Sequence, residues 1–145
     1  MCACCRYKYQ KRISGPLLDP IDIHIEVPRV DYEKLSGDRM EGTSESIRKR
    51  VQAARNIQQQ RFASSQSDII CNADMRVGEI RQFCKLQDEG QSLMRAAMSQ
   101  LNLSARAYHR ILKLARTIAD LAGSEEIQSP HLAEALQYRP KLMMG

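Results

Sequence analysis

The chain has 145 residues and a net charge of +5, with 43% hydrophobic residues but only 5% aromatic residues and no tryptophan. A core of Leu, Ile, Ala and Met favours a helical domain of ordinary size, and the basic charge permits a polyanion partner such as nucleic acid or nucleotide phosphate, although a solvated basic surface would give the same charge. No run of about 18 apolar residues exists and the N-terminus lacks an apolar signal region, so we expect neither a membrane span nor a signal peptide.

Residues 1–12 are cationic and contain the closely spaced cysteines Cys2, Cys4 and Cys5. Thiolates at this spacing cannot close a tetrahedral zinc site alone, and the other cysteines, Cys71 and Cys84, are distant in sequence. We therefore favour a frayed terminus over a metal site. The total of five cysteines is odd, and a reducing cytoplasm is the simplest setting for it.

Residues 21–27, IDIHIEV, alternate strictly between apolar and polar side chains. This period of two, with β-branched residues on the apolar side, predicts a β-strand, the only one expected. A lone strand cannot satisfy its backbone hydrogen bonds, so we expect its sheet to lie in a missing part of a larger protein. His24 has no second ligand at a suitable spacing, and we interpret it as an ordinary residue of the polar face.

A short helical turn is expected over residues 31–35, and after a polar loop a long helix over residues 44–62. The apolar seam of the long helix is narrow, so we expect it to pack through one edge, with its cations facing a phosphate, a neighbouring subunit or solvent. The seam comprises Ile47, Val51, Ala54 and Phe62, and the cations are Arg48, Lys49, Arg50, Arg55 and Arg61.

Beyond a Ser/Gln-rich linker at residues 63–68, residues 72–139 are expected to form a compact unit of four helices. The first covers residues 75–86, the second opens at Asp88, and the fourth opens at Ser129 and Pro130. The apolar positions expected inside the first two are Val77, Ile80, Cys84, Leu93, Met94, Ala97, Met98 and Leu101.

The third of these helices, over residues 104–123, organises the unit, with Ser104 as its N-cap and Gly123 as its stop. Its apolar stripe, at helical spacing, is Tyr108, Ile111, Leu114, Ala115, Ile118 and Leu121. Its opposite face is basic: Arg106, His109, Arg110, Lys113 and Arg116. The stripe needs a partner surface, which the flanking helices would supply, and the basic face is the candidate functional surface.

No catalytic constellation is present in the sequence. The phosphate loop GxxxxGK[ST], the nucleophile motif GxSxG and the metal motif HExxH are all absent, and no carboxylates are paired at a useful spacing. The chain does carry a dense set of arginines on two predicted helices, and arginine forms bidentate hydrogen bonds with phosphate.

Three stretches carry a resemblance to a known family: RISGPLLDPIDIHIEVP (residues 12–28), IRKRVQAARNIQQQRF (47–62), and LSARAYHRILKLARTIADL followed by HLAEALQYR. They resemble the C-terminal part of the magnesium-chelatase-like AAA+ ATPases, in the bacterial competence-associated branch. The resemblance implies a mainly α fold, in which one orphan core β-strand and a long basic helix precede a helical lid bundle. Residues 1–43 would end the ATPase core, with a disordered N-terminus; residues 44–70 would form the connecting helix and linker, and residues 71–145 the four-helix lid.

Within that lid, Arg106 matches the family's sensor-2 arginine, which reaches the γ-phosphate, and Arg110 is expected to assist in nucleotide binding. A helix N-terminus favours anions, and a forked cation can follow charge that develops on a transferred phosphoryl group. ATP and Mg²⁺ would bind through an ATPase core that is missing here. The chain alone would be inactive, since the P-loop and Walker B residues are absent, while its parent would work as a ring oligomer and act on DNA.

One position departs from the family pattern. The family reads LLDRID, whose arginine serves as an arginine finger towards the neighbouring subunit, whereas this chain has Pro20 at that place. Proline cannot stabilise phosphoryl charge, so either Arg12 or another residue substitutes or activation in trans is weak.

Two other interpretations are compatible with the residues. The chain could be a stand-alone helical nucleic-acid-binding module that uses the two basic helices, although such a module would not need the orphan strand. It could also be a helical scaffold without a ligand, in which case the basic faces would serve solubility alone.

Overall fold

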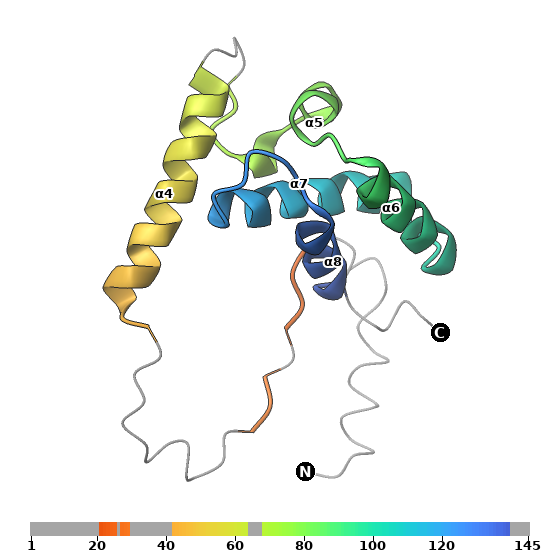
Figure 1. The fold of residues 1–145 in the computed structure, drawn as a ribbon, viewed down its shortest axis with the longest axis horizontal. Helices are drawn as coiled ribbons and strands as arrows, with labels where there is room; N and C mark the ends of the chain where they lie inside the picture. Colours follow the sequence, from red (N-terminus) through yellow and green to blue (C-terminus); the bar gives the residue numbers. More distant parts are fainter. Residues whose placement is uncertain (1–20, 26, 30–41, 64–67, 140–145) are drawn as a thin grey trace.

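The structure, a computed structural model, describes residues 21–25, 27–29, 42–63 and 68–139 (Figure 1). Within these ranges the regular elements are all helical, and the β-contact present is an isolated parallel bridge between Leu86 and Ile127. The mainly helical fold expected from the sequence is therefore confirmed. The elements are α4 (Ser44–Ala63), the 3-10 helix η1 (Asn72–Asp74), α5 (Val77–Phe83), α6 (Asp88–Gln100), α7 (Ala105–Leu121) and α8 (Ser129–Gln137).

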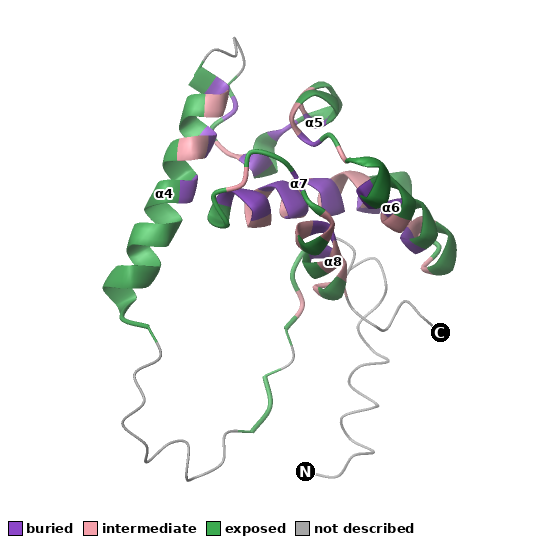
Figure 2. Cartoon of the chain, viewed as in Figure 1, coloured by how far each residue is buried: buried purple, intermediate pink, exposed green. Residues whose placement is uncertain are grey.

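Helix α7 lies at the centre of the helical unit and contacts α4, η1, α5 and α8, while α6 packs on α8 (Figure 1). The buried residues in Figure 2 concentrate along it. Ala115 and Ala119 of α7 meet Leu132 and Ala135 of α8 in the core, and all four are fully buried. Small side chains on both helices let the two backbones approach closely, which fixes α8 against α7.

The ends of α7 are set by local chemistry, as the sequence predicts. Ser104 is the N-cap, and its Oγ accepts a hydrogen bond of 3.1 Å from the backbone N–H of Ala107. At the other end Gly123 adopts a positive φ of 68°, and the N–H groups of Gly123 and Ser124 donate to the carbonyls of Asp120 and Ala119. This hydrogen-bond pair is the Schellman motif, which reverses the chain direction after the helix.

Helix α4 packs through its C-terminal half alone. Ala54 and Phe62 are buried, and the Phe62 ring meets Phe83 edge-on at 5.7 Å between centroids. Ile47 and Val51, which the predicted seam also included, are 52% and 41% exposed. The seam prediction is therefore confirmed at one end and wrong at the other, because no element in the described part of the chain covers the first turns of α4 (Figure 2).

The strand predicted over residues 21–27 does not form in the described part of this segment. A strand needs a neighbour to exchange backbone hydrogen bonds with, and none of the described residues provides one. A backbone hydrogen bond between described residues ties the segment to the end of α8: the N–H of His24 donates to the carbonyl of Tyr138 at 2.9 Å. The apolar side chains of Ile21, Ile23, Ile25 and Val27 remain exposed.

Several boundaries differ from the predicted ones by a few residues. The helix expected over residues 75–86 is the shorter α5, and Val77 at its first position is 45% exposed rather than inward. Helix α8 includes Ser129 and takes Gln128 as its N-cap. The turn expected at residues 31–35, and the positions Arg12, Pro20 and Cys2, Cys4 and Cys5, lie outside the described residues. None of the described helices is both long and apolar enough to cross a membrane.

Candidate functional site

The N-terminal half of α7 gathers basic side chains at one hollow. Arg106, His109, Arg110 and Lys113 recur at helical spacing, so they lie on adjoining turns and line a hollow of about 280 Å³. The other described residues that line it are Met75, Val77 and Ile80, and none of these is a carboxylate. A hollow with cationic walls and no acid attracts an anion.

Arg106 occupies the second position of α7, in the first turn, and is exposed. Among the residues that the structure describes, its guanidinium has neither an ion-pair nor a hydrogen-bond partner. The first turn of a helix also carries partial positive charge from its unpaired N–H groups. Among the described residues that line this hollow, Arg106 is thus a cation that an anion from outside could reach.

Arg110, the second predicted binding residue, already has an acid partner. Its Nε lies 2.8 Å from Oδ1 of Asp22, in an ion pair whose side chains are 20% and 46% exposed. Asp22, Arg110 and Lys113 also line an adjoining hollow of about 410 Å³. The pair ties the segment 21–25 to α7 and offsets part of the Arg110 charge, so Arg110 offers an anion less attraction than Arg106.

Lys113, one turn further along α7, is tethered to η1. Its Nζ donates a hydrogen bond of 2.7 Å to the backbone carbonyl of Ala73. The ammonium group still carries its full charge, because a carbonyl neutralises none of it. Lys113 can therefore add to the field of the hollow without moving towards a ligand.

Arg116 does not belong to the basic face, and the prediction that placed it there is wrong. The residue is 2% exposed, its Nε donates to Oδ1 of Asp120 at 3.0 Å, and its Nη atoms donate to the carbonyls of Ser124 and Glu125 at 2.6 and 2.8 Å. The physical reason is the turn at Gly123, which folds the chain back over the end of α7 and presents these carbonyls to the guanidinium.

Asp120 is the acceptor at the centre of a buried polar cluster. Its side chain is fully buried and forms ion pairs with Arg116 and with Arg61 of α4. Oδ2 of Asp120 also accepts hydrogen bonds from Arg61 Nη1 at 2.8 Å and from Asn72 Nδ2 at 2.7 Å. Oδ1 of Asn72 in turn accepts a hydrogen bond from Arg61, and the backbone N–H of Asn72 donates to Oε1 of Gln58. We call Arg61, Asn72, Arg116 and Asp120 the buried cluster; it ties α4 and η1 to α7.

Sequence reasoning missed the buried cluster because its partners are far apart in the chain. The helical pattern predicts Arg61 among the cations of α4 that face a phosphate, a neighbouring subunit or solvent, whereas in the structure it pairs with Asp120. The available signal was the spacing of Arg116 and Asp120, which places opposite charges one turn apart on the same helix. That spacing predicts the ion pair between Arg116 and Asp120. It predicts neither the burial of this pair nor the second arginine, Arg61, that joins it.

The described part of the chain contains no group of three or more His, Cys, Asp or Glu side chains that could hold a metal ion. The cationic lining of the hollow at Arg106 suits an anionic group such as phosphate.

Comparisons with known proteins identify two matching family profiles and several relatives of the chain. A family profile described as magnesium chelatase, subunit ChlI C-terminal, matches residues 41–139, and one described as magnesium chelatase, subunit ChlI, matches residues 1–35. The competence protein ComM of Haemophilus influenzae is 46% identical over 134 residues, which cover 91% of this chain and 25% of that protein. The protein YifB is 41% identical over 133 residues in Escherichia coli and 37% identical in Salmonella typhimurium, again over 91% of this chain and 25% of the relative. The chain thus spans about a quarter of the length of these relatives.

Proposed function

The chain belongs to the magnesium chelatase ChlI family, within the AAA+ ATPases, and from this premise we propose that it forms the lid over the nucleotide in an ATP-hydrolysing protein. In this proposal Arg106 reaches the γ-phosphate of ATP. The observation that carries the proposal is the hollow on α7, where an exposed arginine without a described partner stands among cations and no carboxylate.

The chemistry of this arrangement fits phosphoryl transfer. A guanidinium can donate two parallel hydrogen bonds to phosphate oxygens, and its charge stabilises the charge that accumulates on the transferred group. Arg110 supplies a second cation at reduced strength because it shares its charge with Asp22. Mg²⁺ would accompany ATP and be held elsewhere in the protein, since the described residues contain no ligand set for it.

We further propose that residues 71–145 are the lid, residues 44–70 the connection and residues 1–43 the end of the ATPase core. The exposed Ile21, Ile23 and Ile25 support this division, because an apolar edge of this kind is stable only against a partner surface. We expect residues 21–27 to pair with a sheet of the core and to become a strand there. The 145 residues alone carry no P-loop or Walker B motif, so we expect them not to hydrolyse ATP.

The parent protein is proposed to work in the cytoplasm as a ring of subunits and to act on DNA. The exposed arginines of α4 support a DNA contact, because Arg48 and Arg50 in its first turns and Arg55 beyond its midpoint stand in solvent. The same observation favours a second candidate, a stand-alone nucleic-acid-binding module. The two candidates differ in one respect. The module would bind DNA in a salt-dependent manner without nucleotide, whereas the ATPase would couple its contact with DNA to ATP binding and hydrolysis.

Steady-state ATP hydrolysis by the full-length protein tests the proposal. Arg106→Ala should lower turnover about 100-fold, which corresponds to about 3 kcal/mol of lost transition-state stabilisation. Lys49→Ala is the matched control, since Lys49 is an exposed cation of α4 that pairs with Glu45 on the surface. Turnover of Arg106→Ala within about twofold of the control would refute the sensor role.

A further inference from the structure

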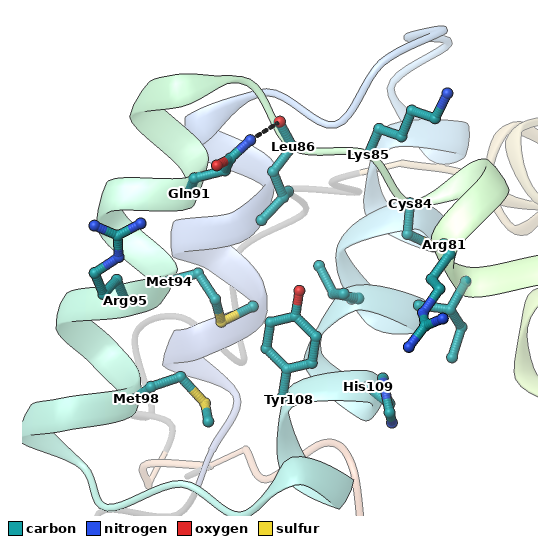
Figure 3. A pocket seen from close by; sticks show the side chains of 12 residues that line it. Arg81, Cys84, Lys85, Leu86, Gln91, Met94, Arg95, Met98, Tyr108 and His109 are labelled. Atoms are coloured by element: carbon teal, nitrogen blue, oxygen red, sulfur yellow. Dashed lines mark hydrogen bonds between the residues drawn. The ribbon is translucent and has the colours of Figure 1, made fainter. Parts of the chain in front are cut away.

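A second and larger hollow, of about 750 Å³, lies between α5, α6 and α7 (Figure 3). Its floor is apolar: Met94 and Met98 from α6 face Tyr108 from α7. Ile80 and Leu112 also line it. Met94, Ile80 and Leu112 are buried, whereas Met98 and Tyr108 are half-buried and reachable from outside. We call this hollow the α5–α6–α7 groove.

Cations stand on both walls of the groove. Arg81 in α5 and Lys85 just beyond it lie on one side, and Arg95 of α6 lies on the other (Figure 3). All three side chains are exposed, and none has an ion pair within the described parts of the chain. Among the described residues that line the groove there is no Asp or Glu. An occupant therefore meets an apolar strip with positive charge along both edges.

This layout selects one class of occupant. A small ligand with a single anionic group would engage one wall and leave the cations of the other unpaired. An amphipathic helix with carboxylates on both sides of an apolar stripe would place its stripe on the floor and its acids against both walls. Methionine side chains are flexible and polarisable, so Met94 and Met98 can adapt to the side chains of such a helix.

We propose that the α5–α6–α7 groove is a docking surface for an acidic amphipathic helix of a partner protein. The apolar stripe of the partner covers Met98 and Tyr108, and its carboxylates pair with Arg81, Lys85 and Arg95. The inference does not depend on the role of Arg106, because none of these residues lines the hollow at that arginine. His109 and Ile80 line both hollows, so the bound helix would lie next to the proposed nucleotide site.

Fluorescence anisotropy with the full-length protein tests the proposal. The probe is a labelled helical peptide of about 18 residues with leucines at positions i, i+3, i+4 and i+7 and glutamates on both flanks of the leucine stripe. A matched peptide carries lysine in place of glutamate. The glutamate peptide should bind saturably in the micromolar range, and the lysine peptide at least about tenfold more weakly, with the difference shrinking at high salt.

Charge reversal identifies the surface that the peptide uses. Arg81→Glu and Arg95→Glu should each weaken binding at least about tenfold, one on each wall, while Lys49→Glu on α4 leaves it unchanged. With methyl-labelled methionine, the NMR signals of Met94 and Met98 should shift on binding. Each variant should retain its helices, because all the exchanged side chains are exposed. Circular dichroism of each variant checks this.

Three results would overturn the proposal. The first is binding of the glutamate peptide that does not saturate. The second is binding of this peptide by both charge-reversed variants with the affinity of the unchanged protein. The third is Met94 and Met98 signals that stay in place while the peptide binds. Dodecyl phosphate provides the competing case, an anionic amphiphile with a single head group. If it shifts Met94 and Met98 while the peptide does not, the groove is a small-ligand pocket and the docking proposal is wrong.

Discussion

Two arginines at opposite ends of α7 have opposite surroundings. Arg116, near the C-terminal end, is 2% exposed and donates to a carboxylate and two carbonyls, whereas Arg106, in the first turn, is exposed and has no partner among the described residues. Helical spacing put both on one basic face. The difference teaches that the cover over a helix end, rather than residue type or spacing, decides whether a cation stabilises the fold or is available to a ligand.

The C-terminal end of α7 around Arg116, which we call the closed end, is covered by other parts of the chain. The turn at Gly123 brings carbonyls over Arg116, and α4 brings Arg61 to the same carboxylate, Asp120. At the N-terminal end of α7 around Arg106, which we call the open end, the described contacts include the Ser104 cap and the partly exposed ion pair of Asp22 with Arg110. Substitutions at the closed end should therefore change stability, and substitutions at the open end should change nucleotide handling.

Asp120→Ala should have the largest effect on stability. It leaves the charges of Arg61 and Arg116 without their acid in a mostly buried site, which is expected to cost about 3–5 kcal/mol of unfolding free energy. Urea unfolding of the chain, followed by circular dichroism, measures this loss. Glu79→Ala, at an exposed helix N-terminus, is the control and should cost less than about 1 kcal/mol. A loss at Asp120 no larger than that at Glu79 would mean that the buried cluster does not hold the closed end together.

Phe62→Ala tests the apolar part of the same cover. Phe62 is 4% exposed and packs on Phe83, so its truncation should lower the unfolding free energy by about 3 kcal/mol or more. Val51→Ala on the same helix should cost less than about 1 kcal/mol, because Val51 is 41% exposed. Thermal or urea unfolding of both variants gives the difference. Equal losses would show that the first turns of α4 are packed in solution.

The reactivity of the Cys84 thiol reports how well water is excluded from the core beneath the closed end. Burial raises the pKa of its thiol to about 11, and the nearby charges of Arg116 and Arg61 oppose this shift only in part. The reactive thiolate is therefore scarce below the raised pKa, and at pH 8 iodoacetamide should label Cys84 at least about tenfold more slowly than the half-buried Cys71. Mass spectrometry of the labelled peptides measures both rates. Labelling of Cys84 should accelerate as the pH rises towards 11, and equal rates at pH 8 would contradict the dry core.

Asp22→Ala should have the smallest effect, and it sharpens the account of the open end. Removing the acid takes away the opposing charge of Asp22 at Arg110, so the affinity of the full-length protein for ATP should rise about two- to threefold, an effect typical of a partly exposed ion pair. Titration with a fluorescent ATP analogue measures it. A fall in affinity would mean that Asp22 positions Arg110 for the nucleotide rather than competing for its charge.

The parts of the fold that were predictable from the sequence are those with local causes. The extent of α7 follows from its apolar period, the Ser104 cap and the positive φ that Gly123 readily adopts, all of which are encoded within the helix and its immediate neighbours. The same holds for α4 and α6, whose starts lie within a residue of the predicted ones. The exposure of Val51 was not predictable, because it depends on what covers the helix.

The candidate site shows the same division. Spacing identified Arg106, Arg110 and Lys113 as neighbours, and the structure brings them to one hollow. The burial of Arg116 depends on a chain reversal and on Arg61, which is remote in sequence, so no local pattern revealed it. The α5–α6–α7 groove was likewise invisible, since three helices must pack before its apolar floor and its two cationic walls come together.

The central claim, that Arg106 at the open end of α7 meets the γ-phosphate, is tested most directly by nucleotide discrimination. The affinities for a non-hydrolysable ATP analogue and for ADP would be measured with the full-length protein and with Arg106→Ala. The account predicts that Arg106→Ala weakens binding of the ATP analogue about tenfold and leaves ADP within about twofold, while the unfolding free energy is unchanged. Equal losses for both nucleotides, or none for either, would contradict it.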